Sequence, residues 1–345
     1  MTRPLSWAAV VAVGVFTATS LLHILAAERS TPQSARLPPR DIPASSFSSI
    51  EVSLPAGARE LGPFVHIGNG QLAVAQPEPG RVFIGTLVGK TLQWQGEIAR
   101  SKVVGGLAFA ARTGIILLDP AAREFRVLSV EGKVVRSFPQ AGFERDICMV
   151  QDGSIVSTTF PDGLLSRSDA TGRTLGHIGS RFSYENKDLD FALNAGSLAC
   201  WNDRVYIGMI QPSVVRAYSL SGTLLWESQL DLPKPPPPAI RRTELPGGMV
   251  SIASSYALAT LDIAADAARR IFALKSGLVL PDAMKSGSDR IEVLSPTGTR
   301  LAELRLPFRA RRMEIVDGTL YLSGSAPFRL RSAPLVDLHL PVGVK

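Results

Sequence analysis

Few of the residue types that carry catalysis or hold metals are present in this chain. Its 345 residues include four histidines and two cysteines. The histidines are His23, His66, His177 and His339, and no two of them have the spacing of a zinc-binding pair. No G-x-S-x-G, H-E-x-x-H or P-loop motif occurs. These absences argue against the hydrolases, metalloproteases and nucleotide-binding enzymes defined by those motifs, and we expect no cofactor.

Aromatic residues are also scarce, at 7% of the chain, although the formal net charge is +7. We find no basic stripe with interleaved aromatic residues, so the composition argues against a nucleic-acid-binding protein. The positive excess suits an anionic partner or anionic lipid headgroups. We expect most of the charged residues to lie on a solvated surface.

The two cysteines, Cys148 and Cys200, are too few for a disulfide-stapled scaffold. When the turns at Asp152-Gly153 and Asn202-Asp203 are aligned, Val150 rather than Cys148 lies opposite Cys200. A disulfide needs Cα atoms within about 7 Å of each other. We therefore expect two small buried residues that are not bonded to each other.

Formal charge is absent between Arg3 and Glu28. The 23 residues of this stretch from Leu5 to Ala27 would span roughly 34 Å as a helix, which is enough to cross a bilayer. We expect an uncleaved transmembrane anchor within residues 1–28; a cleaved signal peptide is the alternative. The residues chosen to mark this span are Leu5, Trp7, Phe16, Leu22, His23 and Leu25.

A Ser-, Pro- and Arg-rich linker is expected at 29–46, followed by the folded domain at 47–345. By analogy with exported propellers behind such a segment, we expect a bacterial-type cytoplasmic membrane protein with one span and the domain on the periplasmic side.

The stretch from Gly105 to Phe138 reads as four short strands separated by three turns. Its first turn contains Gly114, its middle loop contains Pro120, and its last turn is Glu131-Gly132-Lys133. The same three signals recur in the same order downstream, first at intervals of about 40 residues. The pattern predicts four strands per repeat and hence an all-β fold, a six-bladed β-propeller of four-stranded antiparallel blades.

The sixth repeat shows three clear strands, and we expect residues 47–54 to supply the fourth and close the ring. The predicted blades cover 64–98, 105–138, 146–179, 196–230, 256–307 and 310–340. A seventh blade at 248–275 is the alternative. Residues 231–255 are expected to form an irregular loop with a polyproline II spacer at Pro235–Pro238.

The recurring D-G or N-D first turn, loop proline and x-G-K/T last turn resemble those of the six-bladed propellers of the NHL-repeat and TolB-like group. The resemblance covers about 47–340. It implies the propeller architecture and leaves the activity open, because this group includes enzymes, scaffolds and ligand-binding proteins.

In a propeller, the connections between blades and the loops between second and third strands lie on one face, where long loops are often functional. We expect that face to be basic and to bind a partner. Its candidate residues are Arg100, Lys102, Arg145, Arg181, Tyr184, Lys187, Arg241, Arg242, Arg309, Arg311 and Arg312. Four carboxylates on the same face, Glu144, Asp146, Asp188 and Asp190, are candidate metal ligands.

Three functions follow as hypotheses. The first is a non-catalytic accessory subunit that docks on an integral-membrane complex, for example a respiratory or photosynthetic one. The second is a sensor that takes a small ligand or peptide into the central channel. The third is a metal-dependent hydrolytic propeller that resembles lactonases and lyases and uses the four carboxylates. The absence of a catalytic signature favours the first.

Overall fold

The computed structural model describes residues 38–340 except 56, 59–60, 111–113, 141–145, 160–162, 185–189, 235, 237, 246–248, 280–281, 283–285 and 325–327. The predicted membrane span and half of the predicted linker lie outside this range. Among the described residues, no helix has the length and apolar character needed to cross a membrane.

Strands dominate the fold, and most belong to antiparallel sheets in which four consecutive strands pair in chain order. We number these four-stranded blades from one. The first is β3 (Phe64–Gly68), β4 (Gln71–Gln76), β5 (Arg81–Val88) and β6 (Thr91–Arg100). The second is β7 (Gly106–Ala110), β8 (Gly114–Asp119), β9 (Glu124–Leu128) and β10 (Val134–Pro139). The third is β11 (Ile147–Met149), β12 (Ile155–Thr158), β13 (Leu165–Ser168) and β14 (Thr174–Ile178).

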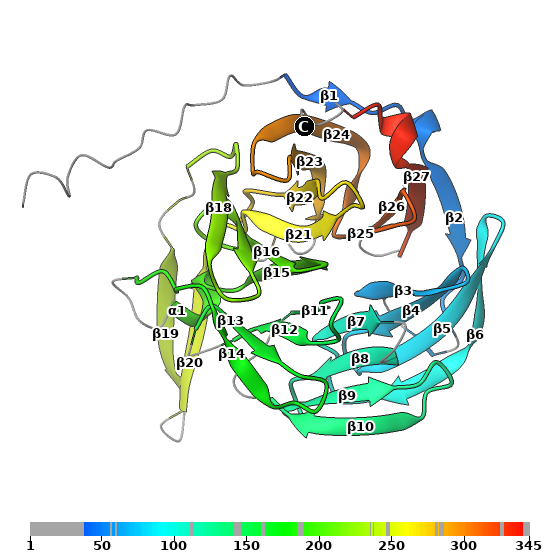
Figure 1. Ribbon diagram of the computed structural model, residues 1–345, viewed down its shortest axis with the longest axis horizontal. Helices are drawn as coiled ribbons and strands as arrows, with labels where there is room; N and C mark the ends of the chain where they lie inside the picture. The colour runs from blue at the N-terminus through cyan, green and yellow to red at the C-terminus, as the bar shows by residue number, and fades with distance from the viewer. Residues whose placement is uncertain are drawn as a thin grey trace, which may run out of the picture. The chain divides into compact units, whose positions relative to one another are not determined.

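The later strands continue this plan. The fourth blade is β15 (Gly196–Trp201), β16 (Arg204–Met209), β17 (Val214–Ser219) and β18 (Leu224–Gln229). The fifth is β21 (Thr260–Ala265), β22 (Ile271–Lys275), β23 (Ser288–Leu294) and β24 (Arg300–Ala310). The sixth set contains β25 (Arg312–Val316), β26 (Thr319–Ser323), β27 (Leu330–Pro334) and, from the N-terminal side, β2 (Ser48–Val52). Figure 1 shows the sets around a common centre, with the first strand of each innermost.

The N-terminal segment joins the sheets at two places. β2 pairs antiparallel with β27 and also makes a short parallel pairing with β6, in which Glu51 faces Thr91 and Val52 faces Leu92. The two residues of β1 (Arg40–Asp41) pair in parallel with the outer strand β24 of the fifth blade. Through β2, the first and sixth blades are joined into one eight-stranded sheet.

Apolar side chains pack between neighbouring blades. One core cluster combines Ala73, Val82 and Ile84 of the first blade with Ile115 and Leu117 of the second, and all five are almost fully buried. Strand β8 is buried along nearly its whole length, as expected for a strand covered on both faces. This packing on both faces explains why the sequence of β8 contains an uninterrupted run of apolar residues.

The last turn of a blade contacts the outer strand of the blade before it. Gly298 in the fifth blade has φ +82°, and a Cβ there would lie 2.7 Å from the Trp226 ring of β18. The indole N–H of Trp226 donates a hydrogen bond to the Pro296 carbonyl of the same turn at 2.9 Å. This turn therefore requires glycine for its backbone angle and for the space beside the tryptophan.

The segment 231–255 is not the irregular loop that we predicted. It contains a hairpin of β19 (Ala239–Leu245) and β20 (Met249–Ser255), paired in register from Ala239 with Ser255 to Leu245 with Met249. The sequence between the strands, P-G-G at 246–248, is a hairpin-type loop signal that the preceding run of prolines obscured. Two residues of the predicted polyproline spacer, 235 and 237, lie outside the description.

A buried ionic network lies inside the fifth blade. The Nζ atom of Lys275 donates to Glu292 Oε2 at 2.7 Å, to Glu303 Oε2 at 2.9 Å and to the Asp231 carbonyl at 2.9 Å. The side chains of Lys275 and Glu292 are fully buried. Arg300 Nη2 also donates to Glu303 Oε2, at 2.6 Å. Because the charges are paired and hydrogen-bonded, the blade can bury them.

We predict that Lys275→Met lowers the free energy of unfolding by about 3–5 kcal/mol, because Glu292 and Glu303 then stay buried without the lysine that hydrogen-bonds both. Of these two carboxylates, Arg300 still donates a hydrogen bond only to Glu303. Denaturant titration of the purified domain measures the change. Arg173→Met, which removes an exposed ion pair to Asp169, is the control and should change stability little. Adding Glu292→Gln and Glu303→Gln to Lys275→Met should restore part of the loss. Equal, small effects of Lys275→Met and Arg173→Met would contradict the network's role.

Candidate binding site at the channel mouth

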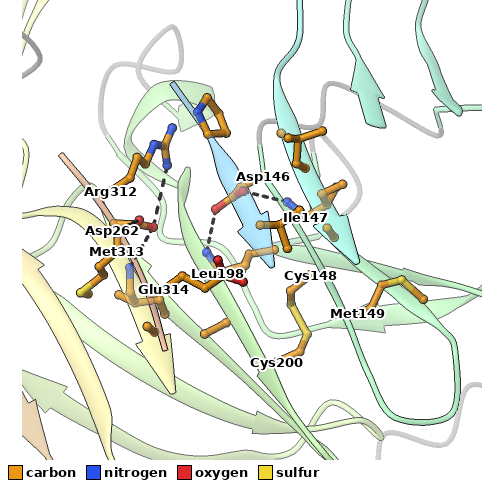
Figure 2. Close-up of a pocket in the computed structure, with 18 of the residues that line it drawn as sticks. Asp146, Ile147, Cys148, Met149, Leu198, Cys200, Asp262, Arg312, Met313 and Glu314 are labelled. Carbon is orange, nitrogen blue, oxygen red and sulfur yellow. Dashed lines mark hydrogen bonds and ion pairs between the residues drawn. A yellow bond between two sulfur atoms is a disulfide. The ribbon is translucent and has the colours of Figure 1, made fainter. Parts of the chain in front are cut away.

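The innermost strands of all six sets line a central channel. The channel encloses a cavity of about 260 Å³, bordered by residues of β3, β7, β11, β15, β21 and β25. Its polar side chains include Asp146, Asp262, Arg312 and Glu314, and Figure 2 shows how they lie around it. The sequence predicted a propeller channel but did not assign these four residues to it as a group.

A second, larger cavity of about 480 Å³ lies at one end of these strands. We call it the mouth cavity. Its lining shares Pro63, Gly105, Asp146 and Arg312 with the channel. Much of the wall is apolar. The apolar side chains that line it are Leu61, Pro63, Pro77, Val104, Ala195, Ile210, Leu258 and Leu261, together with the aromatic ring of Tyr256. A volume in this range is typical of small-molecule pockets.

Asp146, just before β11, bridges two blades. Its Oδ1 accepts a hydrogen bond from the N–H of Ile147 at 2.9 Å, and its Oδ2 accepts one from the N–H of Leu198 in β15 at 2.9 Å. Removal of this carboxylate from water raises its pKa, and the nearby Arg312 opposes that rise. Asp146 therefore satisfies a backbone donor on the neighbouring blade while it faces the channel.

Asp262 in β21 repeats this arrangement one blade pair further on. Its Oδ2 accepts from the N–H of Met313 in β25 at 2.7 Å, and its Oδ1 accepts from its own neighbour Ile263 at 3.1 Å. Burial raises the pKa of Asp262 to about 7, and the charge of Asp146 adds to the rise while Arg312 opposes it. The Arg312 Nη1 lies 3.8 Å from Asp262 Oδ1, which is an ion pair but not a hydrogen bond.

Glu314 makes a third bridge, from β25 to β3. The backbone N–H of His66 lies 3.0 Å from each carboxylate oxygen of Glu314, and the His66 ring Nδ1 lies 3.1 Å from Oε2. The His66 ring also packs against Tyr321, with ring centroids 4.2 Å apart. Three carboxylates in the channel thus bind backbone donors of an adjacent blade.

Our prediction about the cysteines was wrong, because Cys148 and Cys200 form a disulfide with Cα atoms 5.6 Å apart. Neighbouring blades converge at their innermost strands. Cysteines on those strands can therefore come close enough to bond, although the outer strands of the same blades lie further apart. The disulfide and the Asp146–Leu198 hydrogen bond both join residues 52 apart in sequence. Alignment of the turns gave an offset of 50, because the connection after the first strand differs in length between the two blades.

The predicted partner-binding residues that the structure describes differ in their surroundings. Arg311 and Arg312 line the mouth cavity. Tyr184 is half-buried, and its hydroxyl donates to the Gln211 carbonyl at 2.9 Å. Burial raises the Tyr184 pKa to about 12. Of the other predicted residues, three are exposed: Arg100, Lys102 and Arg309. Arg181 is half-buried, and Arg241 and Arg242 lie on β19. Arg145 and Lys187 lie outside the described residues.

The predicted metal ligands are only partly covered. Glu144 and Asp188 lie outside the described residues. Asp146 lines the channel, whereas Asp190 begins the short helix α1 (Asp190–Leu193) and accepts a hydrogen bond from the Tyr184 N–H at 3.1 Å. Within the part of the chain that is described, no group of three or more His, Cys, Asp or Glu side chains is placed to hold a metal ion.

Asp262 and Glu314 were missed at the sequence level, although a signal was present. Each is the one carboxylate of a first strand, in T-L-D-I-A-A and in R-M-E-I-V, with apolar residues on both sides of it. A charge at such a position needs a partner inside the fold.

No protein-family model matches the chain, and no curated protein matches its sequence. Among solved structures, two of virginiamycin B lyase from Staphylococcus aureus, one of them a catalytically inactive form with quinupristin, match with a TM-score of 0.52. They are 11% identical to this chain and cover 83% of it and 98% of the lyase. The WD40 propeller domain of Doa1 aligns with a TM-score of 0.47, 9% identity, and coverage of 83% of this chain and 96% of that domain.

At these identities the lyase structures show the fold alone. With the strand pairing, they confirm the predicted all-β propeller with four-stranded antiparallel sheets.

We predict that the disulfide contributes about 4 kcal/mol to stability, from the loop of 52 residues that it closes in the unfolded chain. Cys148→Ala with Cys200→Ala should lower the free energy of unfolding by up to this amount. Alkylation of the unreduced, unfolded wild type should modify no cysteine. Two alkylated cysteines in that sample would contradict the disulfide.

We predict that Asp262 lowers stability as the pH rises from about 4 to about 7. Its pKa is raised on folding, so in this window the folded state binds more protons than the unfolded state. The wild type should therefore lose stability relative to Asp262→Asn, by at most about 1.4 kcal/mol per pH unit. Thermal unfolding of both proteins at a series of pH values measures the difference.

The control for this experiment is Asp169→Asn at a surface turn. Hydrogen bonds from Thr171 lower the pKa of Asp169 to about 2, so its contribution to stability should be lost only as the pH falls below about 4. A difference between wild type and Asp262→Asn that stays constant from pH 4 to 7 would contradict the raised pKa.

Proposed function

We propose that the protein is a non-catalytic binding propeller, and that its ligand or partner segment enters the mouth cavity. The observation that carries the proposal is a cavity of about 480 Å³ that combines apolar walls with Arg311, Arg312 and Asp146 at the end of the channel. Binding sites typically combine an apolar surface with a few convergent polar groups in this way. The propeller fold is also compatible with an interaction scaffold.

We further propose that the domain works on the exported side of a cytoplasmic membrane, held there by the uncharged N-terminal stretch. The Cys148–Cys200 disulfide supports this location, because disulfides persist in oxidising compartments and are rare in the cytosol. The composition of the predicted linker before β1, at 29–39, suits a tether. Membership of the NHL-repeat and TolB-like group belongs to the same proposal and rests on the turn pattern.

Two kinds of occupant follow from this proposal. In an accessory subunit of an integral-membrane complex, the mouth would receive a segment of a partner protein. In a sensor, it would receive a small molecule. The volume and the apolar lining of the mouth cavity favour the second reading, since they match a small molecule without requiring a large flat interface.

A plugging substitution tests the role of the mouth. Ile210 lines the mouth cavity and is only partly buried, so Ile210→Trp should fill the space without disturbing a blade core. Val135→Trp, at an exposed position on the outer strand β10, is the matched control. Full-length protein is extracted from native membranes in mild detergent, separated by size and examined by native mass spectrometry for bound polypeptides and small molecules.

We expect a stoichiometric companion with the wild type and with Val135→Trp, and at least about a tenfold lower occupancy with Ile210→Trp. A companion that Ile210→Trp retains fully would place the binding site elsewhere. A chain that carries no companion of either kind would contradict the proposed binding function.

A further inference from the structure

Arg312 lies where the channel and the mouth cavity meet, and it lines both. Its side chain is 31% exposed. Within the described part of the chain, the guanidinium donates no hydrogen bond, and its nearest carboxylate oxygen is the Asp262 Oδ1 at 3.8 Å. A guanidinium carries five N–H donors in a planar fork that fits a carboxylate with two parallel hydrogen bonds. At this position those donors are free for a ligand.

The carboxylates around Arg312 already have other partners. Asp146 accepts from two backbone N–H groups, and so does Asp262. Both therefore stay fixed to the neighbouring blades, and neither reaches the arginine with hydrogen-bonding geometry. The cation is held near these two anions without being capped by either.

We infer that the mouth cavity binds a small carboxylic acid with an apolar body, whose carboxylate pairs with Arg312. This inference rests on the proposed binding function and names the ligand class for the same cavity. The apolar body would lie along Leu61, Val104, Leu258 and Leu261, which line the wall beside the arginine. Arg312 has the carboxylates of Asp146 and Asp262 close by, and this suits a monoanion better than a doubly charged phosphate, since the carboxylates would repel the second negative charge of the phosphate more strongly.

The charges that face this position make binding depend on pH. Asp146 and Asp262 face Arg312 from the third and fifth blades, Glu314 lies two residues further along β25, Arg311 lies next to it, and His66 binds Glu314 from the first blade. A ligand carboxylate beside Arg312 adds a negative charge near Asp262 and so raises the free energy needed to ionise Asp262, whose pKa is already about 7. Binding therefore takes up a proton, and the affinity should be higher at pH 6 than at pH 8.

Decanoate and its neutral isostere decanamide provide the test, because they share the apolar body and differ in the charged group. Binding to the purified full chain is measured by calorimetry and by the shift in Tm at pH 6 and pH 8. We expect decanoate to bind at least about tenfold more tightly than decanamide at pH 6, with a smaller preference at pH 8.

Three variants assign that preference to its residue. Arg312→Gln should abolish the preference for decanoate, and Arg312→Lys should keep part of it, since the charge remains but the fork is lost. Arg309→Gln, at an exposed position that lines neither cavity, should leave the preference unchanged. If Arg312→Gln does not fold, Ile210→Trp in the wild-type background still tests whether decanoate occupies the mouth.

Other outcomes overturn the inference in distinguishable ways. Equal binding of decanoate and decanamide, blocked by Ile210→Trp, would leave the binding function intact and remove the carboxylate from it. Binding of a hydrophobic pentapeptide with a free C-terminus but not of its C-terminal amide, without binding of decanoate, would identify a polypeptide end as the source. No binding of any probe would overturn the ligand class, while the companion found on extraction from membranes decides the binding function separately.

Discussion

The innermost strands of this propeller converge without pairing through a shared sheet, so backbone N–H groups on their edges need partners from side chains. Asp146, Asp262 and Glu314 supply these partners to Leu198, Met313 and His66 of the adjacent blades. An unpaired buried N–H costs about as much as a lost hydrogen bond, so these carboxylates are a structural requirement of the centre. This requirement also sets the electrostatics of the channel, because two of these carboxylates, Asp146 and Asp262, interact with the charge of Arg312.

The structure handles charge differently in the two buried places where it occurs. In the fifth blade, Lys275 donates hydrogen bonds to Glu292 and Glu303, Arg300 donates one to Glu303, and the side chains of all four residues are buried. In the channel, Arg312 is 3.8 Å from its nearest described carboxylate oxygen and borders an open cavity. The first arrangement stabilises a blade, whereas the second leaves donor groups available in a partly apolar surrounding.

Much of the blade plan could be predicted from the sequence, because turn chemistry is local. Gly132, Gly172, Gly222 and Gly298 mark the last turns, and each has the positive φ that such turns require. The hairpin at 239–255 was missed because a proline run precedes it. The disulfide and the carboxylate bridges were missed for a different reason. They depend on the register between blades, which the lengths of the connections set and which the spacing of turns within a blade does not report.

The N-terminal segment enters the fold by adding strands to outer edges: β1 to β24, and β2 between β27 and β6. A pull applied from the N-terminal side therefore acts first on the pairing of β1 with the fifth blade and then on the join between the first and sixth blades. The two-residue β1 would yield first, and β2 would carry the load next across its pairings on both sides. The mechanical strength of the ring under tension is thus set at this join, far from the blades closed by their own hairpins.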